Sequence, residues 1–275
     1  MKKARFISAV FAVLALTLGQ AALAQQASGN GSTDVVQKVG HGEINWSAKK
    51  ITATGSGAAN LKDGPVAVAR LNAERAAKLD ALRNILESLK GVQIDGKRNA
   101  GDLMSNGQIS TRVQGIAKGF KVVDTRYYSD GSVDVVVELP LDEQLVSALD
   151  VEVSGKKKKG GTASHTGLVV NAKGLGVSPS LAPRIVDEKG KEIFGASVVT
   201  AEGLKDGGIA NYASDPEKAK DASLVGATPL VVKALALDKG SKTDIVISNA
   251  DAEKLRDPSL DTAFLADGKV VIVVD

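Results

Sequence analysis

The stretch that most constrains the fold is residues 66–90, "VAVARLNAERAAKLDALRNILESLK", because its apolar residues recur with a helical period. At 100° per residue, the large apolar side chains fall into a sector of about 120°; they are Val68, Leu71, Leu79, Leu82, Ile85, Leu86 and Leu89. The small residues Ala69, Ala73 and Ala76 lie on the neighbouring flank. We therefore predict one long helix that packs its leucine face on a sheet and leaves its alanine flank open to another chain.

Two basic residues, Arg75 and Lys78, fall inside the leucine sector. We interpret Arg75 as a side chain whose stem packs while its guanidinium reaches the edge of the sheet. The alternative is that Arg75 binds a carboxylate or a sugar. Arg75 and the three alanines are the candidate interaction residues.

Strand-like runs flank the predicted helix. Residues 44–53 alternate apolar and polar side chains, with a slip at Lys49 and Lys50 that we interpret as a β-bulge. Residues 120–140 hold two β-rich runs around a Ser-Asp-Gly turn, which predicts a hairpin. Residues 107–119 are predicted to be extended and residues 142–149 to be a short helix. The first domain, residues 41–152, is thus expected to be a β-α-β-β module with one long helix on a small antiparallel sheet.

A lysine-rich segment, residues 153–165 ("VSGKKKKGGTASH"), separates this module from the rest of the chain. A run of like charges repels itself and buries nothing, so we predict a solvated linker; the alternative is contact with anionic lipid head groups or an acidic partner. Residues 166–275 are predicted to form a mostly β domain with short helices, including hairpins within 182–195 and 228–249 and a buried closing strand within 268–275. The expected fold class is therefore α+β.

The N-terminus has the pattern of a secretory signal peptide, residues 1–24. Three basic residues precede an apolar run shorter than the ~20 residues of a membrane span, and Ala22-Leu23-Ala24 predicts cleavage between Ala24 and Gln25. Residues 25–40 are expected to be a flexible leader. Without the signal peptide the formal charge of +3 falls to zero, and aromatic residues are only 3% of the chain, so nucleic acid is not an expected partner. The expected location is the periplasm, and the lack of cysteine excludes disulfides and a lipidated thiol.

Two glycine-rich strings beside the helix resemble nucleotide-binding loops. "GSGAAN", Gly55–Asn60, has asparagine where a dinucleotide fingerprint needs its third glycine, and "GVQIDGKR", Gly91–Arg98, follows a helix where a phosphate loop must precede one. We interpret both as turns, with Gly91 ending the helix in a left-handed conformation. The histidines, His41 and His165, lack ligand partners at metal-binding spacing. No catalytic, cofactor-binding or metal site is predicted.

Residues Trp46 to Leu141 resemble a known family in three segments: "ATGSGAA", "AERAAKLDALRNILESLKGVQI" and "GIAKGFKVVDTRYYSDGSVDVVVELPL". They are similar to the small outer-membrane lipoprotein family first described in Helicobacter, which is related to the flagellar basal-disk protein P and the flagellar H-ring protein T. The resemblance implies a non-catalytic module that packs against copies of itself or a partner. Because the family's lipidated cysteine is missing, any attachment to the outer membrane would run through protein contacts or peptidoglycan.

These features favour an exported, non-enzymatic structural or assembly protein of the bacterial cell envelope, with the flagellar basal body as one setting. Its expected partners are other envelope proteins or further copies of the chain. The alternative is a periplasmic small-ligand or glycan-binding module in the second domain, with Arg184, Lys233 and Arg256 as contacts and Tyr212 and Phe194 as the aromatic residues. A third hypothesis, a hydrolase, lacks any nucleophile–base pair in the sequence.

Overall fold

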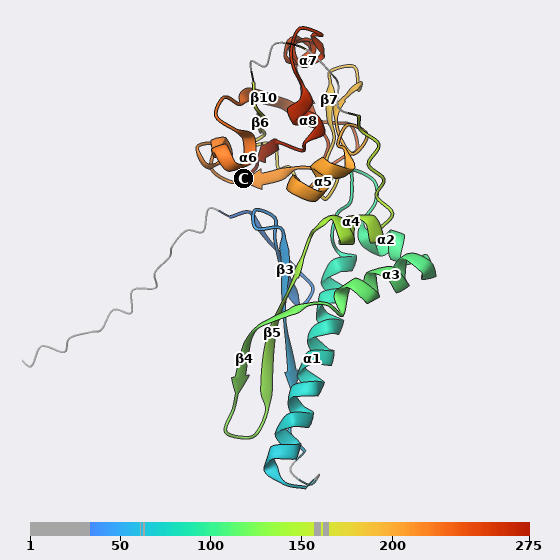
Figure 1. Cartoon of the computed structure of the whole chain (residues 1–275), viewed down its shortest axis with the longest axis vertical. Coiled ribbons are helices and arrows are strands. Elements are labelled where there is room, and N and C mark those ends of the chain that lie inside the picture. Colours follow the sequence, from blue (N-terminus) through green and yellow to red (C-terminus); the bar gives the residue numbers. More distant parts are fainter. Residues whose placement is uncertain (1–33, 61, 63, 157–160, 162–164) are drawn as a thin grey trace, which may run out of the picture. The chain divides into compact units, whose positions relative to one another are not determined.

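The computed structural model describes residues 34–60, 62, 64–156, 161 and 165–275, and all of them belong to one compact unit. Within these residues, the strands form two sheets, one in each half of the chain (Figure 1). The combination of a long helix on an antiparallel sheet with a second, mostly β half confirms the α+β class. The predicted signal peptide and its cleavage point, Ala24 and Gln25, lie outside the described residues.

The described N-terminal strands form a five-stranded antiparallel sheet in the order β1-β2-β3-β5-β4. The elements of this half are β1 (Val36–Val39), β2 (Gly42–Asn45), β3 (Lys50–Gly57), α1 (Val66–Lys90), α2 (Ala100–Met104), α3 (Gly107–Ala117), β4 (Lys121–Tyr127), β5 (Val133–Pro140) and α4 (Glu143–Ala148). The predicted β4–β5 hairpin and the short helix after it are confirmed. Asp142 caps that helix by accepting hydrogen bonds from the backbone N–H groups of Gln144 and Leu145.

The predicted bulge near Lys49 is wrong, because the chain turns there. β2 and β3 are separate antiparallel strands with Ile44 opposite Ile51. Lys49 has a φ of 51°, in the left-handed region that a tight turn requires. The two phases of alternation in the sequence therefore belong to the two arms of a hairpin.

α1 packs on β3 through its alanines, so the predicted leucine face is wrong for the first half of the helix; in the second half, Ile85 and Leu89 are buried as predicted. Ala69, Ala73, Ala77 and Ala81 are at most 1% exposed. They lie over β3, where a Cβ on Gly55 would overlap the backbone of Ala77 and Ala81. A Cβ on Gly57 would overlap the backbone carbonyl of Ala73 in the same way. Strand glycines and helix alanines thus bring the two backbones together more closely than leucines would allow.

The second half of α1 is covered on another side by α2 and α3. Residues 107–119 were predicted to be extended, and that prediction is wrong because residues 107–117 form the helix α3. Its buried residues, Ile109, Val113 and Ala117, recur every four positions, and the Asn106 side chain caps its first turn. Gly91 also departs from expectation, since its φ of −81° is not left-handed; a Cβ there would overlap the side chain of Val39.

The described C-terminal strands form a seven-stranded mixed sheet in the order β8-β7-β11-β10-β6-β12-β9. The elements are β6 (Leu168–Asn171), β7 (Ile185–Asp187), β8 (Glu192–Phe194), α5 (Ala201–Gly207), β9 (Asn211–Ala213), η1 (Lys218–Lys220), α6 (Ala222–Val225), β10 (Leu230–Leu237), β11 (Ile245–Ile247), α7 (Asn249–Arg256), α8 (Ala263–Ala266) and β12 (Val270–Val273). Both predicted hairpins, β7–β8 and β10–β11, are confirmed as antiparallel pairs.

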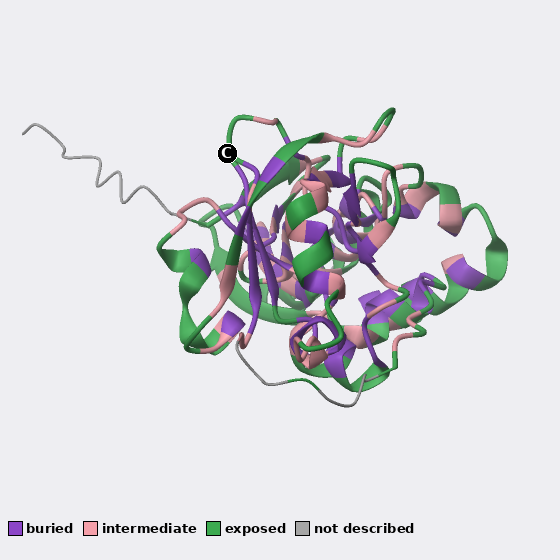
Figure 2. Cartoon of the chain, turned by 90° about the horizontal axis from the view of Figure 1, so that it is seen from above, coloured by how far each residue is buried: buried purple, intermediate pink, exposed green. Residues whose placement is uncertain are grey.

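The closing strand β12 lies inside this sheet, between β6 and β9, and is parallel to both. All of its residues are buried, as expected for a parallel strand that is covered on both faces. The buried residues of the molecule follow these strands and the inner sides of the helices (Figure 2).

Backbone hydrogen bonds join the N-terminal half to the C-terminal half. The N–H of Leu181 donates to the carbonyl of Gln93 at 2.9 Å, and the N–H of Ala182 donates to that of Ile94 at 2.8 Å. The string "GVQIDGKR" therefore forms a contact between the halves. The turn predicted there is confirmed by residues 95–98, and its position beside the second half is a new finding.

Candidate functional site

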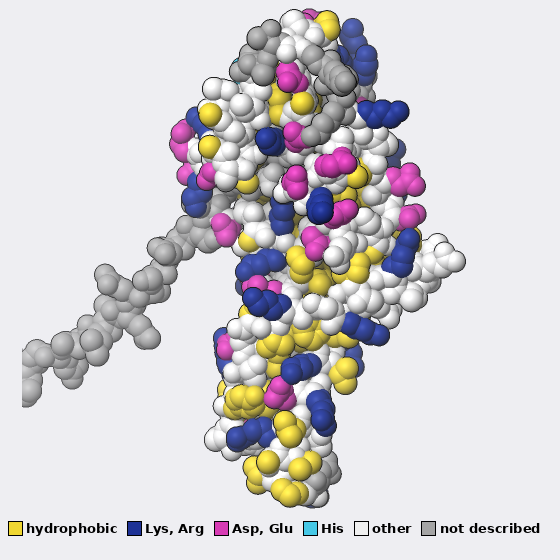
Figure 3. Space-filling view, in the orientation of Figure 1, with side chains coloured by type: hydrophobic (Ala, Val, Ile, Leu, Met, Phe, Trp, Pro, Cys, Tyr) yellow, Lys and Arg dark blue, Asp and Glu magenta, His cyan; other side chains and the backbone are white. Residues whose placement is uncertain are grey.

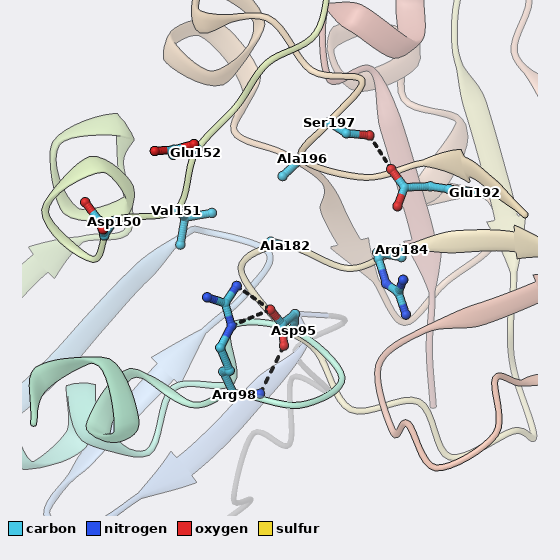
Figure 4. A pocket seen from close by; sticks show the side chains of 10 residues that line it. All are labelled: Asp95, Arg98, Asp150, Val151, Glu152, Ala182, Arg184, Glu192, Ala196 and Ser197. Carbon is cyan, nitrogen blue, oxygen red and sulfur yellow. Dashed lines mark hydrogen bonds and ion pairs between the residues drawn. The ribbon is translucent and has the colours of Figure 1, made fainter. Parts of the chain in front are cut away.

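A polar cleft of about 450 Å³ opens beside this contact (Figure 4). Its lining comes from the 95–98 turn, from the chain that leaves α4, and from the segments around β7 and β8. The residues are Asp95, Arg98, Asp150, Val151, Glu152, Ala182, Arg184, Glu192, Ala196 and Ser197. A volume of this size is within the range of small-ligand sites, roughly 300–1,000 Å³.

Arg98 is held in place by Asp95. Its Nε and Nη2 atoms donate to Asp95 Oδ2 at 2.9 and 2.6 Å, while Asp95 Oδ1 accepts the backbone N–H groups of Lys97 and Arg98. Partial burial opposes ionisation of Asp95, but the hydrogen bonds from Arg98 and from the backbone outweigh it, so the pKa of Asp95 lies below its usual value. The turn thus presents a guanidinium with a fixed direction at the cleft.

Arg184 is oriented by the buried carboxylate of Asp244. Its Nε and Nη2 atoms lie 3.0 and 2.6 Å from Asp244 Oδ2, and the Asp244 side chain is 1% exposed. The hydrogen bond to Asp244 exceeds the effect of burial and holds the pKa of Arg184 above its usual value. Gly96 approaches this pair so closely that a Cβ would collide with Ser241 and crowd Asp244.

The other charged groups of the cleft are carboxylates. Asp150 lies 3.3 Å from Arg112, and Glu192 accepts a hydrogen bond from the hydroxyl of Ser197. Two oriented guanidiniums beside several carboxylates can bind a charged or zwitterionic group. Neither histidine is among the lining residues, and in the described part of the chain no three His, Cys, Asp or Glu side chains are grouped to hold a metal ion.

A second hollow of about 640 Å³ shares Glu192 and Ser197 with the cleft. It is lined by apolar side chains from α7 and α8 and by Arg256. Arg256 donates through Nη1 to the buried carboxylate of Asp187 at 2.7 Å and through Nη2 to the carbonyl of Lys191. Its guanidinium is therefore largely committed to structural bonds.

The residues proposed as ligand contacts lie in different parts of the structure. Arg184 lines the cleft and Arg256 lines the neighbouring hollow, whereas Lys233 is exposed on β10 and lines neither. Tyr212 and Phe194 are buried in the core, so neither offers a ring to a sugar. Asp95 and Arg98 were missed by sequence reasoning, although an Asp three residues before an Arg in a Gly turn signals this hydrogen-bonded loop.

Of the candidate interaction residues on α1, two are buried and two are exposed. Ala69 and Ala73 are 1% exposed because they pack closely on β3, so they cannot form an open flank. Ala76 and Arg75 are exposed, and Arg75 Nη1 lies 3.3 Å from Asn72 Oδ1. Arg75 is thus neither snorkelling to the sheet edge nor buried.

In the first half of α1, the apolar residues of the predicted leucine sector are not covered by the rest of the protein. Val68, Leu71 and Leu79 are 43%, 54% and 65% exposed, and Arg75 lies among them in the helical sequence. We call these four residues the α1 stripe. Hydrophobic side chains are visible on this part of the molecule, over the start of α1 and the β4–β5 hairpin (Figure 3). Among the described residues, no helix has the length and hydropathy that a membrane span requires.

The described residues form a two-sheet α+β protein with a polar cleft beside the contact between its halves. Its C-terminal part is similar to a known domain: residues 167–275 match the family model for the second domain of Treponema pallidum Tp0624. The match spans the strands from β6 to β12. No curated protein matches the chain.

Proposed function

We propose that this chain is an exported, non-enzymatic structural or assembly protein of the bacterial cell envelope, with the flagellar basal body as one setting. Three features support the proposal: the signal-peptide pattern, the resemblance of residues 46–141 to envelope and flagellar proteins, and the exposed α1 stripe. Its partners in this proposal are other envelope proteins, reached in the periplasm.

The observation that carries the proposal is the α1 stripe. Along the second half of the same sector, Leu82, Ile85 and Leu86 pack against the core, whereas Val68, Leu71 and Leu79 remain open. Contiguous apolar side chains that stay exposed mark interaction sites. Arginine, here Arg75, is one of the residue types that dominate binding at protein interfaces.

Site-directed photocrosslinking in intact cells tests this role. A photoreactive residue at Leu79 is expected to capture one envelope protein, and the same residue at Arg83, whose side chain is 76% exposed, is the matched control. Leu71→Gln should reduce capture at position 79 while leaving the thermal melt of the purified chain unchanged. Capture that is equal at both positions, or absent at both, contradicts the proposal.

A second candidate function, binding of a small charged ligand, is favoured by the polar cleft. Arg98 and Arg184 are oriented there by their own carboxylates, which lowers the entropy lost on binding. A thermal-shift screen with periplasmic metabolites and peptidoglycan fragments tests it, with Arg98→Gln as the variant that should lose any stabilisation. If no compound raises the melting temperature of the parent chain, this candidate is rejected.

A further inference from the structure

Strand β4 is exposed on both faces and along one edge. Among the strands of the described residues, it is the last of the N-terminal sheet and pairs with β5 alone. Six of its seven residues are exposed, and Val122, Val123 and Tyr127 are 37%, 43% and 53% exposed. An edge strand of this length offers unpaired backbone groups to another strand, and the charges and the bulge that β4 carries restrict which strand can pair with it.

The ladder shows which backbone groups of β4 are free. On β3, the carbonyl of Thr54 and the N–H of Ser56 bind side chains of α1, so these residues point away from β5. Their partners on β5, Val136 and Asp134, must then point toward β4, because backbone groups alternate in an antiparallel sheet. Asp124 and Arg126 pair with those two residues. The N–H and C=O groups of Thr125 and Tyr127 therefore point outward.

Among two-fold axes through Asp124, Thr125 and Arg126, the charges on β4 favour one for pairing of the strand with itself. Paired residues share a face, so a two-fold axis must pass through a residue. An axis through Asp124 places two aspartates opposite each other, and an axis through Arg126 does the same with two arginines. Like charges directly opposite are unfavourable.

An axis through Thr125 is complementary. It places Asp124 opposite Arg126 of the second chain twice, and Val123 opposite Tyr127 twice. Within one chain, Arg126 Nε already lies 2.8 Å from Asp124 Oδ2, so both charges are on one face. Val123 is the bulge residue between Val122 and Asp124, so the regular part of the ladder runs from Asp124 to Arg126 and the Val123–Tyr127 pairs lie at its two ends.

We propose that β4 pairs antiparallel with β4 of a second copy of this chain, across a two-fold axis through Thr125. The two N-terminal sheets then become continuous, and the α1 helices lie on the same face of the joined sheet. This inference extends the proposed assembly role and rests on it, because it names a second copy of the chain as one partner.

Charge reversal tests the register. The full mature chain is measured by sedimentation equilibrium over a concentration series, and the parent is expected to dimerise reversibly. Asp124→Arg and Arg126→Asp each place like charges across the axis, and each should weaken the dimer about tenfold or more. The two single variants are expected to associate when mixed, and the double exchange of both residues should dimerise as the parent does.

Crosslinking tests the axis itself. The chain has no cysteine, so single-cysteine variants react at one place. A short thiol-reactive bifunctional reagent should join two Thr125→Cys chains, whose Cβ atoms lie about 5 Å apart across the axis. Lys121→Cys is the control: in this register the two positions are eight residues apart along the ladder, or roughly 26 Å. Equal crosslinking of both variants overturns the proposal.

The outcomes separate this inference from the proposed function. A chain that stays monomeric at the highest attainable concentration overturns β4 pairing, and so does a dimer that neither charge reversal weakens. If photocrosslinking from Leu79 still captures an envelope protein in those cases, the assembly role stands without the dimer. If the charge variants lose crosslinks to a different protein while the parent is monomeric, β4 binds that protein and the second-copy proposal is wrong.

Discussion

The indole of Trp46 meets the phenol ring of Tyr212 edge-on, with 5.8 Å between ring centroids and 68° between ring planes. Trp46 follows β2 in the N-terminal half, and Tyr212 lies on β9 in the C-terminal half. Next to this contact, the hydroxyl of Ser47 donates to the carbonyl of Tyr212 at 2.8 Å. The chain's one tryptophan therefore reports on the junction between the halves.

We expect both halves to unfold in one transition. In a urea titration, the fluorescence of Trp46 and the far-UV circular dichroism should give the same midpoint. The Tyr212 hydroxyl bonds both the N–H and the carbonyl of Ser180, at 2.9 and 3.0 Å, so Tyr212→Phe leaves two buried groups unpaired. Its expected cost is about 2 kcal/mol, with both signals shifted together. Separate midpoints for the two signals would show that the halves unfold independently.

Substituting the strand glycines should separate α1 from β3. In Gly55→Ala, the new methyl group overlaps the backbone of Ala77 and Ala81, which cannot move without the helix. We expect a loss of about 3 kcal/mol in the free energy of unfolding. Gly115→Ala is the matched control, because nothing lies within 4 Å of its Cβ position on α3; it should gain up to about 1 kcal/mol from helix propensity. Equal effects at both sites would refute the close packing.

The stability of the chain should rise with pH from about pH 8 to pH 10. Burial lowers the pKa of Lys49 to about 8 from 10.5, and its Nζ donates to the carbonyl of Gly207. Between these pH values the unfolded chain binds more protons at Lys49 than the folded chain, so raising the pH favours folding, by at most about 1.4 kcal/mol per pH unit. Below pH 8 the penalty for burying the charge is present in full.

Urea titrations across this pH range measure the effect in two variants. Lys49→Met should flatten the rise, while Lys50→Met, at the neighbouring residue that pairs with Glu138 on the sheet, should retain it. A rise that persists in Lys49→Met assigns it to other groups. The pKa of Tyr212, which burial raises to about 12, affects stability only above pH 10.

Removing Arg184 should destabilise the fold more than removing an exposed arginine. Arg184→Met leaves the buried carboxylate of Asp244 without its cation. Because the Arg184 side chain is 37% exposed, solvent limits the expected loss to about 2 kcal/mol. Arg83→Met breaks an exposed pair with Asp80 and should change stability by less than about 0.5 kcal/mol. Thermal melts of both variants decide the matter; similar losses would mean that the Arg184 pair has no special role.

Periodicity predicted the elements of this fold better than their packing. The long helix, the β4–β5 hairpin and the buried β12 strand follow from local patterns in the sequence. The face that α1 buries does not, because it depends on its partner: β3 offers Gly55 and Gly57, which fit alanine and leave leucine outside. A helical wheel measures the hydrophobicity of one element and not the shape of the surface it meets.

The cleft was harder to predict, because its members are far apart in sequence. Arg184 was proposed as a ligand contact, but its partner Asp244 lies beside it only because β7 pairs with β11, and Arg98 reaches the cleft only through the contact between the halves. The α3 helix was missed for a different reason. Its Ile109 and Val113 are residue types that favour strands, whereas their four-residue spacing, together with the Asn106 cap, is the helical signal.

Beyond the end of β2, the outer edge of β3 is closed by α1. Asp80 accepts the N–H of Ser56 at 3.0 Å, and Asn84 donates to the carbonyl of Thr54 at 2.8 Å, so these side chains occupy the groups that a further strand would need. On that side β1 is four residues long and carries Lys38, a poor template. A sheet with a single open edge cannot grow further once that edge has paired with one other strand. Under the proposed β4 pairing, the N-terminal sheets of two chains would therefore form a finite pair and not a fibril.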